Sequence, residues 1–376
     1  MAFAAFRPLA LCLTLLAAPA LAAPTCEDRG KDYEARIALC DSAYAQAGDP
    51  DDAATALGYK AEAQRMLGRL DEAAETLRAA LRLAPQNPWY WVELGHVRFD
   101  AGDPAGAVAH YSAAIELDPQ DGYARLNRAE GWWRLNAPDR CLADSGPALD
   151  GAPDDPWANL VQGRCLTGLG RAEEGLAHLD RALAADPAWA AVRIARVSAL
   201  LALGRAEEAL AAADEGLAAL PADDGSAQEA LRSLRLQALA RSRPVEEVLA
   251  EAAALAADYP DSLTGPAVKV WTLTRAGRLD EAEAEAAPLR AAETAGAPMQ
   301  GSFHDALAQL ALAQGDLAGA ARQFTLAMAL DPALARIYAR GLSTLGFLPL
   351  SAARYNVALA LQRCLEAKGA ECRIGS

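Results

Sequence analysis

The stretch WVELGHVRFDAGDPAGAVAHYSAAIELDP, from Trp91 to Pro119, carries the strongest structural signal in the chain. Apolar and small residues recur in it at helical spacing on both sides of Gly102. Gly102 can end a first helix by adopting a left-handed conformation, and Pro119 cannot continue a second helix. The stretch therefore predicts two antiparallel helices that are joined by a tight turn and followed by a break.

The same two markers recur every 34 residues on either side of this stretch. The prolines that end second helices are Pro85, Pro119, Pro153, Pro187 and Pro221. The residues that can end first helices are Gly68, Gly102, Asn136, Gly170 and Gly204. A fixed period of this length is typical of stacked helix pairs. Residues 54–221 are therefore predicted to form five regular repeats.

The register of the markers is lost after residue 221. Residues 222–300 are predicted to hold two degenerate repeats, in which Pro244 and Pro288 should interrupt the second helices. The markers return in residues 301–332, which are predicted to form one more regular repeat.

The two ends of the array have helical spacing but lack the markers. Residues 23–53 are predicted to form an N-terminal capping helix, and residues 333–376 to form C-terminal capping helices. Terminal units of a repeat array need a polar outer face, and both segments carry charged residues.

The repeated unit resembles the tetratricopeptide repeat, in which aromatic, Leu and Gly positions are followed by Ala, aromatic, Ala and Pro. The matching residues here are Trp91, Leu94, Gly95, Ala107, Tyr111, Ala114 and Pro119. The resemblance implies an all-α, right-handed superhelical solenoid of antiparallel helix pairs, with about eight repeats plus terminal capping helices. It also implies that the first helices line a concave face, which binds polypeptides in this family.

Residues 1–22 have the pattern of a signal peptide. Arg7 precedes a short apolar run, and Ala20-Leu21-Ala22 provides small residues around a cleavage point after Ala22. An uncleaved membrane anchor is the alternative, but the apolar run is too short to span a bilayer. We therefore expect secretion across the inner membrane, with the periplasm as the location.

The cysteines agree with export. Six remain once the leader is removed, and an even number in an oxidising compartment indicates disulfides. A repeat array brings together only nearby segments, so sequence neighbours should pair. The expected pairs are Cys26 with Cys40, Cys141 with Cys165, and Cys364 with Cys372. Free or mispaired thiols are the alternative.

No sequence motif indicates chemistry. The four histidines lack metal-binding spacing, and neither a phosphate-binding nor a dinucleotide-binding loop is present. The formal net charge of −15 argues against non-specific binding to nucleic acid or anionic lipid. We therefore expect no catalytic residue, cofactor or metal, and a protein or peptide as the partner.

A polypeptide-binding groove is the remaining candidate site. Aromatic residues recur at 34-residue steps at Trp89, Tyr123 and Trp157, and Phe99 and Trp133 form a second, shorter column. The polar candidates between them are His96, Asn127 and Arg164. Exposed aromatic rings with a few polar groups suit peptide binding. The alternative is that these rings only pack between repeats, the role expected for Trp91 and Trp132.

These observations predict a non-enzymatic periplasmic scaffold or adaptor that binds a polypeptide on the concave groove of the repeats. The alternative function is an envelope-assembly chaperone for cytochrome, pilus or outer-membrane clients. Preference for unfolded over folded clients would distinguish the chaperone from the scaffold.

Overall fold

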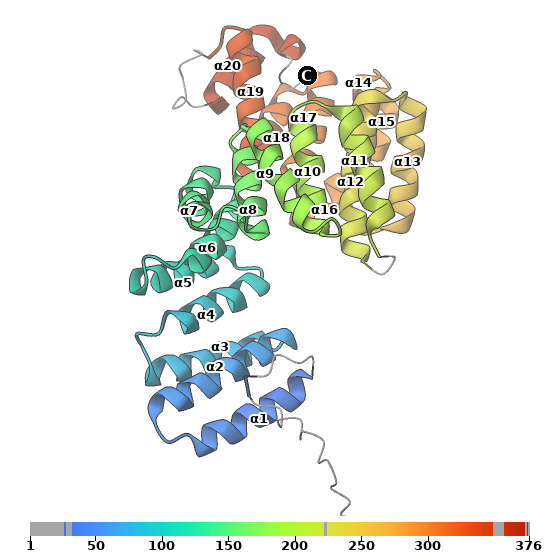
Figure 1. Ribbon diagram of the computed structural model, residues 1–376. Helices are drawn as coiled ribbons and strands as arrows, with labels where there is room; N and C mark the ends of the chain where they lie inside the picture. The colour runs from blue at the N-terminus through green and yellow to red at the C-terminus, as the bar shows by residue number, and fades with distance from the viewer. Residues whose placement is uncertain (1–25, 28–31, 222–223, 349–356, 373, 375–376) are drawn as a thin grey trace, which may run out of the picture. The chain divides into compact units, whose positions relative to one another are not determined.

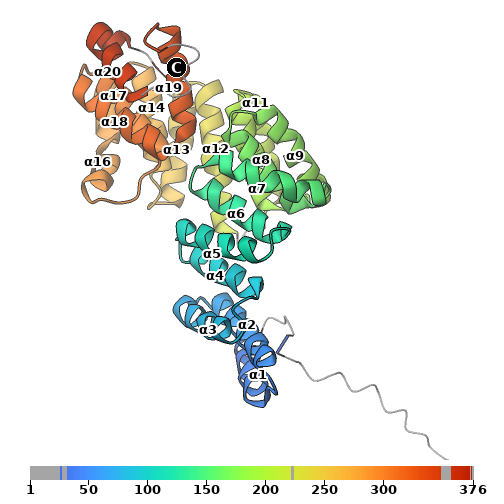
Figure 2. The same ribbon diagram turned by 90° about the vertical axis from the view of Figure 1, so that its left-hand side faces the viewer.

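The structure, a computed structural model, describes residues 26–27, 32–221, 224–348, 357–372 and 374. The predicted signal peptide lies outside these residues. The described part contains twenty α-helices and one short 3-10 helix, Gly369–Glu371, and no strand. The chain divides into two compact units, Met1–Ala101 and Gly102–Ser376, and their helices are labelled in Figures 1 and 2. The predicted all-α fold of paired helices is confirmed.

The first unit has four helices, which are drawn in blue to cyan in Figure 1. They are α1 (Tyr33–Gln46), α2 (Pro50–Met66), α3 (Leu70–Leu83) and α4 (Pro88–Asp100). The Asp49 side chain accepts hydrogen bonds of 2.9 Å from the backbone N–H groups of Asp51 and Asp52, and Pro50 needs no N–H partner in the first turn. Helix α2 therefore begins ahead of residue 54, where the first regular repeat was expected.

The second unit continues the series of helices. They are α5 (Pro104–Leu117), α6 (Gly122–Arg134), α7 (Pro138–Gly151), α8 (Pro156–Gly168), α9 (Ala172–Ala185), α10 (Ala190–Ala202), α11 (Ala206–Ala219), α12 (Gly225–Ser242), α13 (Val245–Asp258), α14 (Thr264–Arg275), α15 (Leu279–Glu285), α16 (Ala287–Thr294), α17 (Gly301–Ala313), α18 (Leu317–Leu330), α19 (Pro332–Thr344) and α20 (Val357–Lys368). Asp103, Asp121, Asp155 and Asp316 cap the helices that follow them through their side chains. None of the described helices is both long and apolar enough to cross a membrane.

The residues that were predicted to end first helices have the left-handed backbone conformation that this role requires. Gly68, Gly102, Gly170 and Gly204 all have φ between 73° and 80°. Asn136 occupies the third place in the series with φ 54°, and among the described residues it is the only non-glycine with positive φ. Asparagine tolerates this region better than most side chains, which explains why it can substitute for glycine there.

One expectation for the degenerate repeats is wrong and the other is confirmed. Pro244 does not interrupt a second helix: it is the N-cap residue of α13, which then runs unbroken. A proline is tolerated at a helix start because the first N–H groups have no partner within the helix. Pro288 does interrupt its second helix, which is split into α15 and α16.

Contacts between helices identify the inner face of the second unit. The first helices of successive repeats, α6, α8, α10, α12, α14 and α17, each pack against the next one. No comparable packing joins the successive second helices α5, α7, α9, α11 and α13 of the described part. An array whose first helices approach each other more closely than its second helices curves with the first helices inside. We call this side the inner face.

The structure pairs the six cysteines of the described part in the expected way. Cys26 joins Cys40 of α1, Cys141 of α7 joins Cys165 of α8, and Cys364 of α20 joins Cys372. The Cα atoms of the pairs are 4.7, 5.6 and 5.6 Å apart, respectively. Gly369, with φ 53°, turns the chain so that Cys372 returns to α20.

Two side chains connect distant repeats within the second unit. Asn136, in the turn between α6 and α7, donates a hydrogen bond of 3.1 Å to the carbonyl of Leu330 at the end of α18. Arg336 of α19 donates to the carbonyl of Gly168 at the end of α8. We call these two contacts the clasp. A solenoid in which each repeat packs only against its neighbours would not contain the clasp.

A half-buried carboxyl group lies between the last two first helices. Asp305 of α17 accepts a hydrogen bond of 2.5 Å from the Tyr338 hydroxyl of α19 and one of 3.3 Å from Gln309. Burial raises the pKa of Asp305, although both hydrogen bonds oppose this shift. Burial and the neighbouring Asp305 also raise the pKa of Tyr338.

The raised pKa of Asp305 predicts a pH-dependent stability. The folded state holds this proton more tightly than the unfolded state, so its contribution is complete below the unfolded pKa and is lost as pH rises through the folded pKa. We expect Asp305→Asn to gain stability relative to the parent between acid and neutral pH. Urea unfolding over this range measures the difference. Asp280→Asn, which removes an exposed carboxylate, is the control, and an equal trend in both variants would contradict the prediction.

Candidate functional site

The predicted groove residues fall into two sets. Trp89, His96 and Phe99 belong to the first unit. Tyr123, Asn127, Trp133, Trp157 and Arg164 belong to the second unit. The geometry of each set is therefore that of its own unit.

Trp89 packs between α4 and α2 of the first unit. Its ring centroid lies 5.0 Å from that of Tyr59 and 5.3 Å from that of Tyr90. The ring also covers Gly58, where an added Cβ atom would collide with it. Gly58 thus makes room for the indole, and Trp89 is half-buried against the core of this unit.

His96 belongs to a group of charges on α2 and α4. Its Nδ1 atom lies 3.4 Å from Oε1 of Glu93, which is only 7% exposed. Arg65 lies 3.8 Å from the other oxygen of Glu93 and 2.7 Å from Asp100. Burial opposes ionisation of Glu93, but the hydrogen bond from His96 and the charges of His96 and Arg65 outweigh it and lower the pKa of Glu93.

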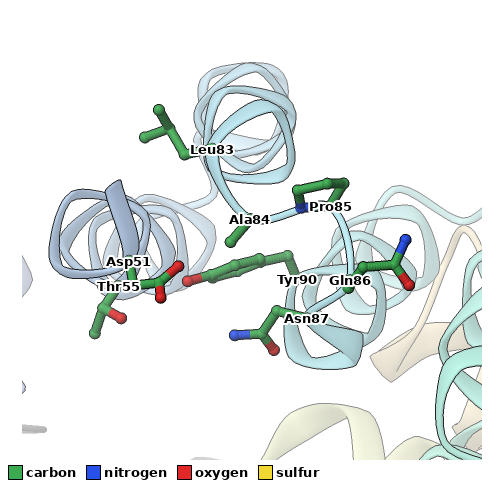
Figure 3. A pocket seen from close by; sticks show the side chains of 8 residues that line it. All are labelled: Asp51, Thr55, Leu83, Ala84, Pro85, Gln86, Asn87 and Tyr90. Carbon is green, nitrogen blue, oxygen red and sulfur yellow. The ribbon is translucent and has the colours of Figure 1, made fainter. Parts of the chain in front are cut away.

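A pocket of about 530 Å³ opens at the N-terminal ends of α2 and α4 in the first unit (Figure 3). The side chain of Tyr90 extends across it toward Asp51 and Thr55. Tyr90 is 1% exposed, and burial raises its pKa. The other lining residues are Leu83, Ala84, Pro85, Gln86 and Asn87. The sequence did not indicate this pocket. The recurring aromatic pattern singled out Trp89 and Trp91, and Tyr90 between them was not singled out.

Tyr123 and Trp157 meet on the inner face of the second unit. Their ring centroids are 5.6 Å apart and the rings are tilted by 55°. Tyr123 is 54% exposed, whereas Trp157 is half-buried and packs against the cores on both sides of α8. The cap of α6 fixes the position of Tyr123, because Asp121 accepts a hydrogen bond of 2.9 Å from its backbone N–H.

A second cluster lies at the other end of the same two helices. Arg164 of α8 donates from Nη1 to both carboxylate oxygens of Glu130 on α6, at 2.9 and 3.0 Å. Its guanidinium carbon lies 4.5 Å from the Trp133 ring centroid, and that of Arg134 lies 5.5 Å away. Cations over an aromatic face stabilise such an arrangement. Trp133 and Arg164 are therefore held in place before any partner arrives.

Asn127 has a local role. It is 8% exposed, and its amide donates a hydrogen bond of 2.9 Å to the carbonyl of Tyr123 one helical turn earlier. Phe99 of the first unit is half-buried. Trp91 and Trp132 are also half-buried and pack against cores, in agreement with the structural role expected for them.

One register position on the inner face was not singled out in the sequence. It lies five residues before the C-cap of each first helix. In the second unit it is occupied by Glu130, Arg164, Ser198, Trp271 and Gln309, whereas in α12 the same count reaches Ala238, which is fully buried and not on the inner face. The equivalent position in the helices of the first unit holds Glu62 and His96. We call this series the inner column. No cluster of three or more potential metal ligands is found among the described residues.

The stacked, antiparallel helix pairs define a helical-repeat protein. Three family models described as tetratricopeptide repeat match residues 55–97, 92–140 and 301–324. These three segments match the tetratricopeptide repeat, and the described helices form the all-α fold of paired helices that such repeats adopt.

Comparisons with individual proteins cover smaller parts. The chain is 37% identical over 82 residues to protein FlbA of Caulobacter vibrioides, a match that covers 22% of this chain and 14% of FlbA. The crystal structure of PilW, a type IV pilus biogenesis factor, is 22% identical and covers 57% of this chain and 97% of PilW, with a TM-score of 0.49. YrrB, a tetratricopeptide-repeat protein with an unusual peptide-binding site, is 19% identical, with coverages of 48% and 91% and a TM-score of 0.39.

Proposed function

We propose that this chain is a non-enzymatic periplasmic scaffold that binds a polypeptide on its inner face. The observation that carries the proposal is the exposed ring of Tyr123, which rests against Trp157 on α6 and α8. An aromatic ring held by a packed neighbour offers apolar area without a large loss of side-chain freedom on binding.

The neighbouring polar groups define what such a partner would meet. Glu130, Arg164 and Trp133 form a rigid ion-pair and aromatic cluster on the same two helices. Rigid polar groups next to an apolar anchor set the orientation of a bound chain more than they add affinity. The leader pattern and the three cysteine pairs support the periplasm as the compartment.

The first test locates the partner. A photo-crosslinking amino acid replaces Tyr123 in one variant and Tyr44 of α1, which is 46% exposed, in the control variant. The proposal expects a polypeptide crosslinked from position 123 and absent from position 44. Capture of the same client only when it is unfolded would favour the envelope-assembly chaperone instead.

The second test measures affinity for the partner so identified. We expect Tyr123→Ala to weaken binding by about tenfold or more, as removal of a central aromatic contact does. The melting temperature should stay near that of the parent because the ring is 54% exposed. Tyr44→Ala is the matched control and should leave affinity unchanged. Equal affinity of Tyr123→Ala and the parent would contradict the proposed site.

A further inference from the structure

Ile374, which follows the last helix, lies against first helices of the second unit. Ile374 is 1% exposed, and its carbonyl accepts a hydrogen bond of 3.1 Å from Gln309 of α17. On its other side, a Cβ atom added to Gly341 of α19 would lie 3.4 Å from the Ile374 backbone and side chain. Ile374 is therefore seated between α17 and α19.

This seat belongs to the inner face. Gln309 occupies the inner column, in register with Glu130 and Arg164 of earlier repeats. First helices from α6 to α17 pack directly on their successors, but α17 and α19 are not in comparably close backbone contact. Ile374 contacts both of these helices.

The seat has features of a surface that binds an extended chain. Gln309 directs a side-chain donor at a main-chain carbonyl, which is independent of the ligand's sequence. Gly341 of α19 lies at van der Waals distance from Ile374 on the opposite side. The branched side chain of Ile374 then enters the core formed with Leu342 and Phe324.

A covalent anchor keeps Ile374 in place. The disulfide between Cys364 and Cys372 fixes the chain two residues before Ile374. A short tether of this kind gives a segment an effective concentration of about millimolar at its seat, so even weak contacts keep it bound.

We propose that the inner face of α17 and α19 is a peptide-binding site that the chain's own Ile374 occupies. The site takes an extended polypeptide with a branched aliphatic side chain, held by Gln309 through its main chain. The disulfide between Cys364 and Cys372 controls how firmly Ile374 stays in the site. This inference does not depend on the proposed partner site at Tyr123, which lies on other helices.

The test uses the full chain and a variant that lacks residues 373–376. The probe is a fluorescent peptide, Ala-Glu-Ser-Arg-Ile-Gly-Ser, which copies residues 370–376 with Cys372→Ser. The control peptide carries aspartate in place of the isoleucine. We expect the shortened chain to bind the isoleucine peptide about tenfold or more tightly than the full chain does. Binding of the aspartate peptide should be undetectable, and Gln309→Ala in the shortened chain should weaken binding.

A second, full-length variant covers the case in which shortening unfolds α19 and α20. Cys364→Ala with Cys372→Ala keeps the full length of the chain but removes the anchor, and it should bind the peptide better than the disulfide-bonded parent. Circular dichroism and the urea midpoint establish which variants are folded. The proposal is overturned if a folded shortened chain does not bind the peptide, or if the parent and the disulfide variant bind it equally.

Discussion

Arg128→Met is expected to lower the free energy of unfolding by about 3 kcal/mol, since it leaves a buried carboxylate without its main counter-charge. Arg128 of α6 donates two hydrogen bonds, of 2.7 and 2.6 Å, to the carboxylate of Asp144 on α7. Asp144 is only 4% exposed. Arg125 remains 3.8 Å from Asp144, which places the loss at the lower end of the range for broken buried pairs.

The repeat provides a matched control. Arg196 stands 68 residues after Arg128, at the same register of α10, and its Nε lies 2.8 Å from Asp180. The side chain of Asp180 is 52% exposed, so Arg196→Met should cost about 1 kcal/mol or less.

Urea unfolding followed by circular dichroism compares the two variants. The double variant Arg128→Met with Asp144→Leu should recover most of the stability, because it leaves no buried charge behind. Equal losses for Arg128→Met and Arg196→Met would show that burial of Asp144 has no energetic weight.

Removal of the disulfide between Cys141 and Cys165 is expected to cost about 3–4 kcal/mol. The crosslink spans 24 residues, and the loss of stability grows with the length of the closed loop because the unfolded chain gains more freedom. Both cysteines are fully buried between α7 and α8, so alanine is the better replacement: it leaves no unpaired hydroxyl group.

A second cysteine pair gives an internal scale for this prediction. The pair Cys364–Cys372 spans only 8 residues and should contribute less, about 2–3 kcal/mol. Thermal unfolding of the two double-alanine variants and the parent, under non-reducing conditions, checks the order. A larger loss at Cys364–Cys372 than at Cys141–Cys165 would contradict it.

Local chemistry made the helix boundaries predictable. A residue with positive φ ends a first helix, and a proline limits a second one, whatever surrounds them. The series from Gly68 to Gly204, with Asn136 in third place, followed from the sequence for that reason. The prediction for Pro244 was wrong because the sequence does not show where the helix boundary lies. A proline that starts a helix differs from one that interrupts a helix only by the position of that boundary.

Side-chain exposure at the candidate site was less predictable. Trp89, Tyr123 and Trp157 share one register, yet Tyr123 is exposed while the two tryptophans are half-buried. The difference comes from neighbours: Gly58 makes room for Trp89, and cores on both sides of α8 receive Trp157. Replacing both tryptophans with alanine would therefore disturb packing, and Tyr123 is the cleaner probe of binding.

The contacts across the second unit could not be deduced from the period at all. They depend on the curvature accumulated over many repeats, and a small change in each repeat moves the end of the array by a large distance. The position of Ile374 against α17 could not be predicted either, because this part of the sequence carries no marker of the repeat.

The clasp changes how the second unit should fold. Its two hydrogen bonds join residues 194 and 168 positions apart, whereas a simple solenoid has only short-range contacts and can nucleate anywhere along its length. Closing so long a loop is entropically costly, so the clasp should form late, after the intervening repeats have stacked. Once the clasp has formed, α19 and the end of α8 should open together, because the opening of either one breaks the contact between them. The unit should then unfold more nearly as one cooperative body than its repeat architecture alone would suggest.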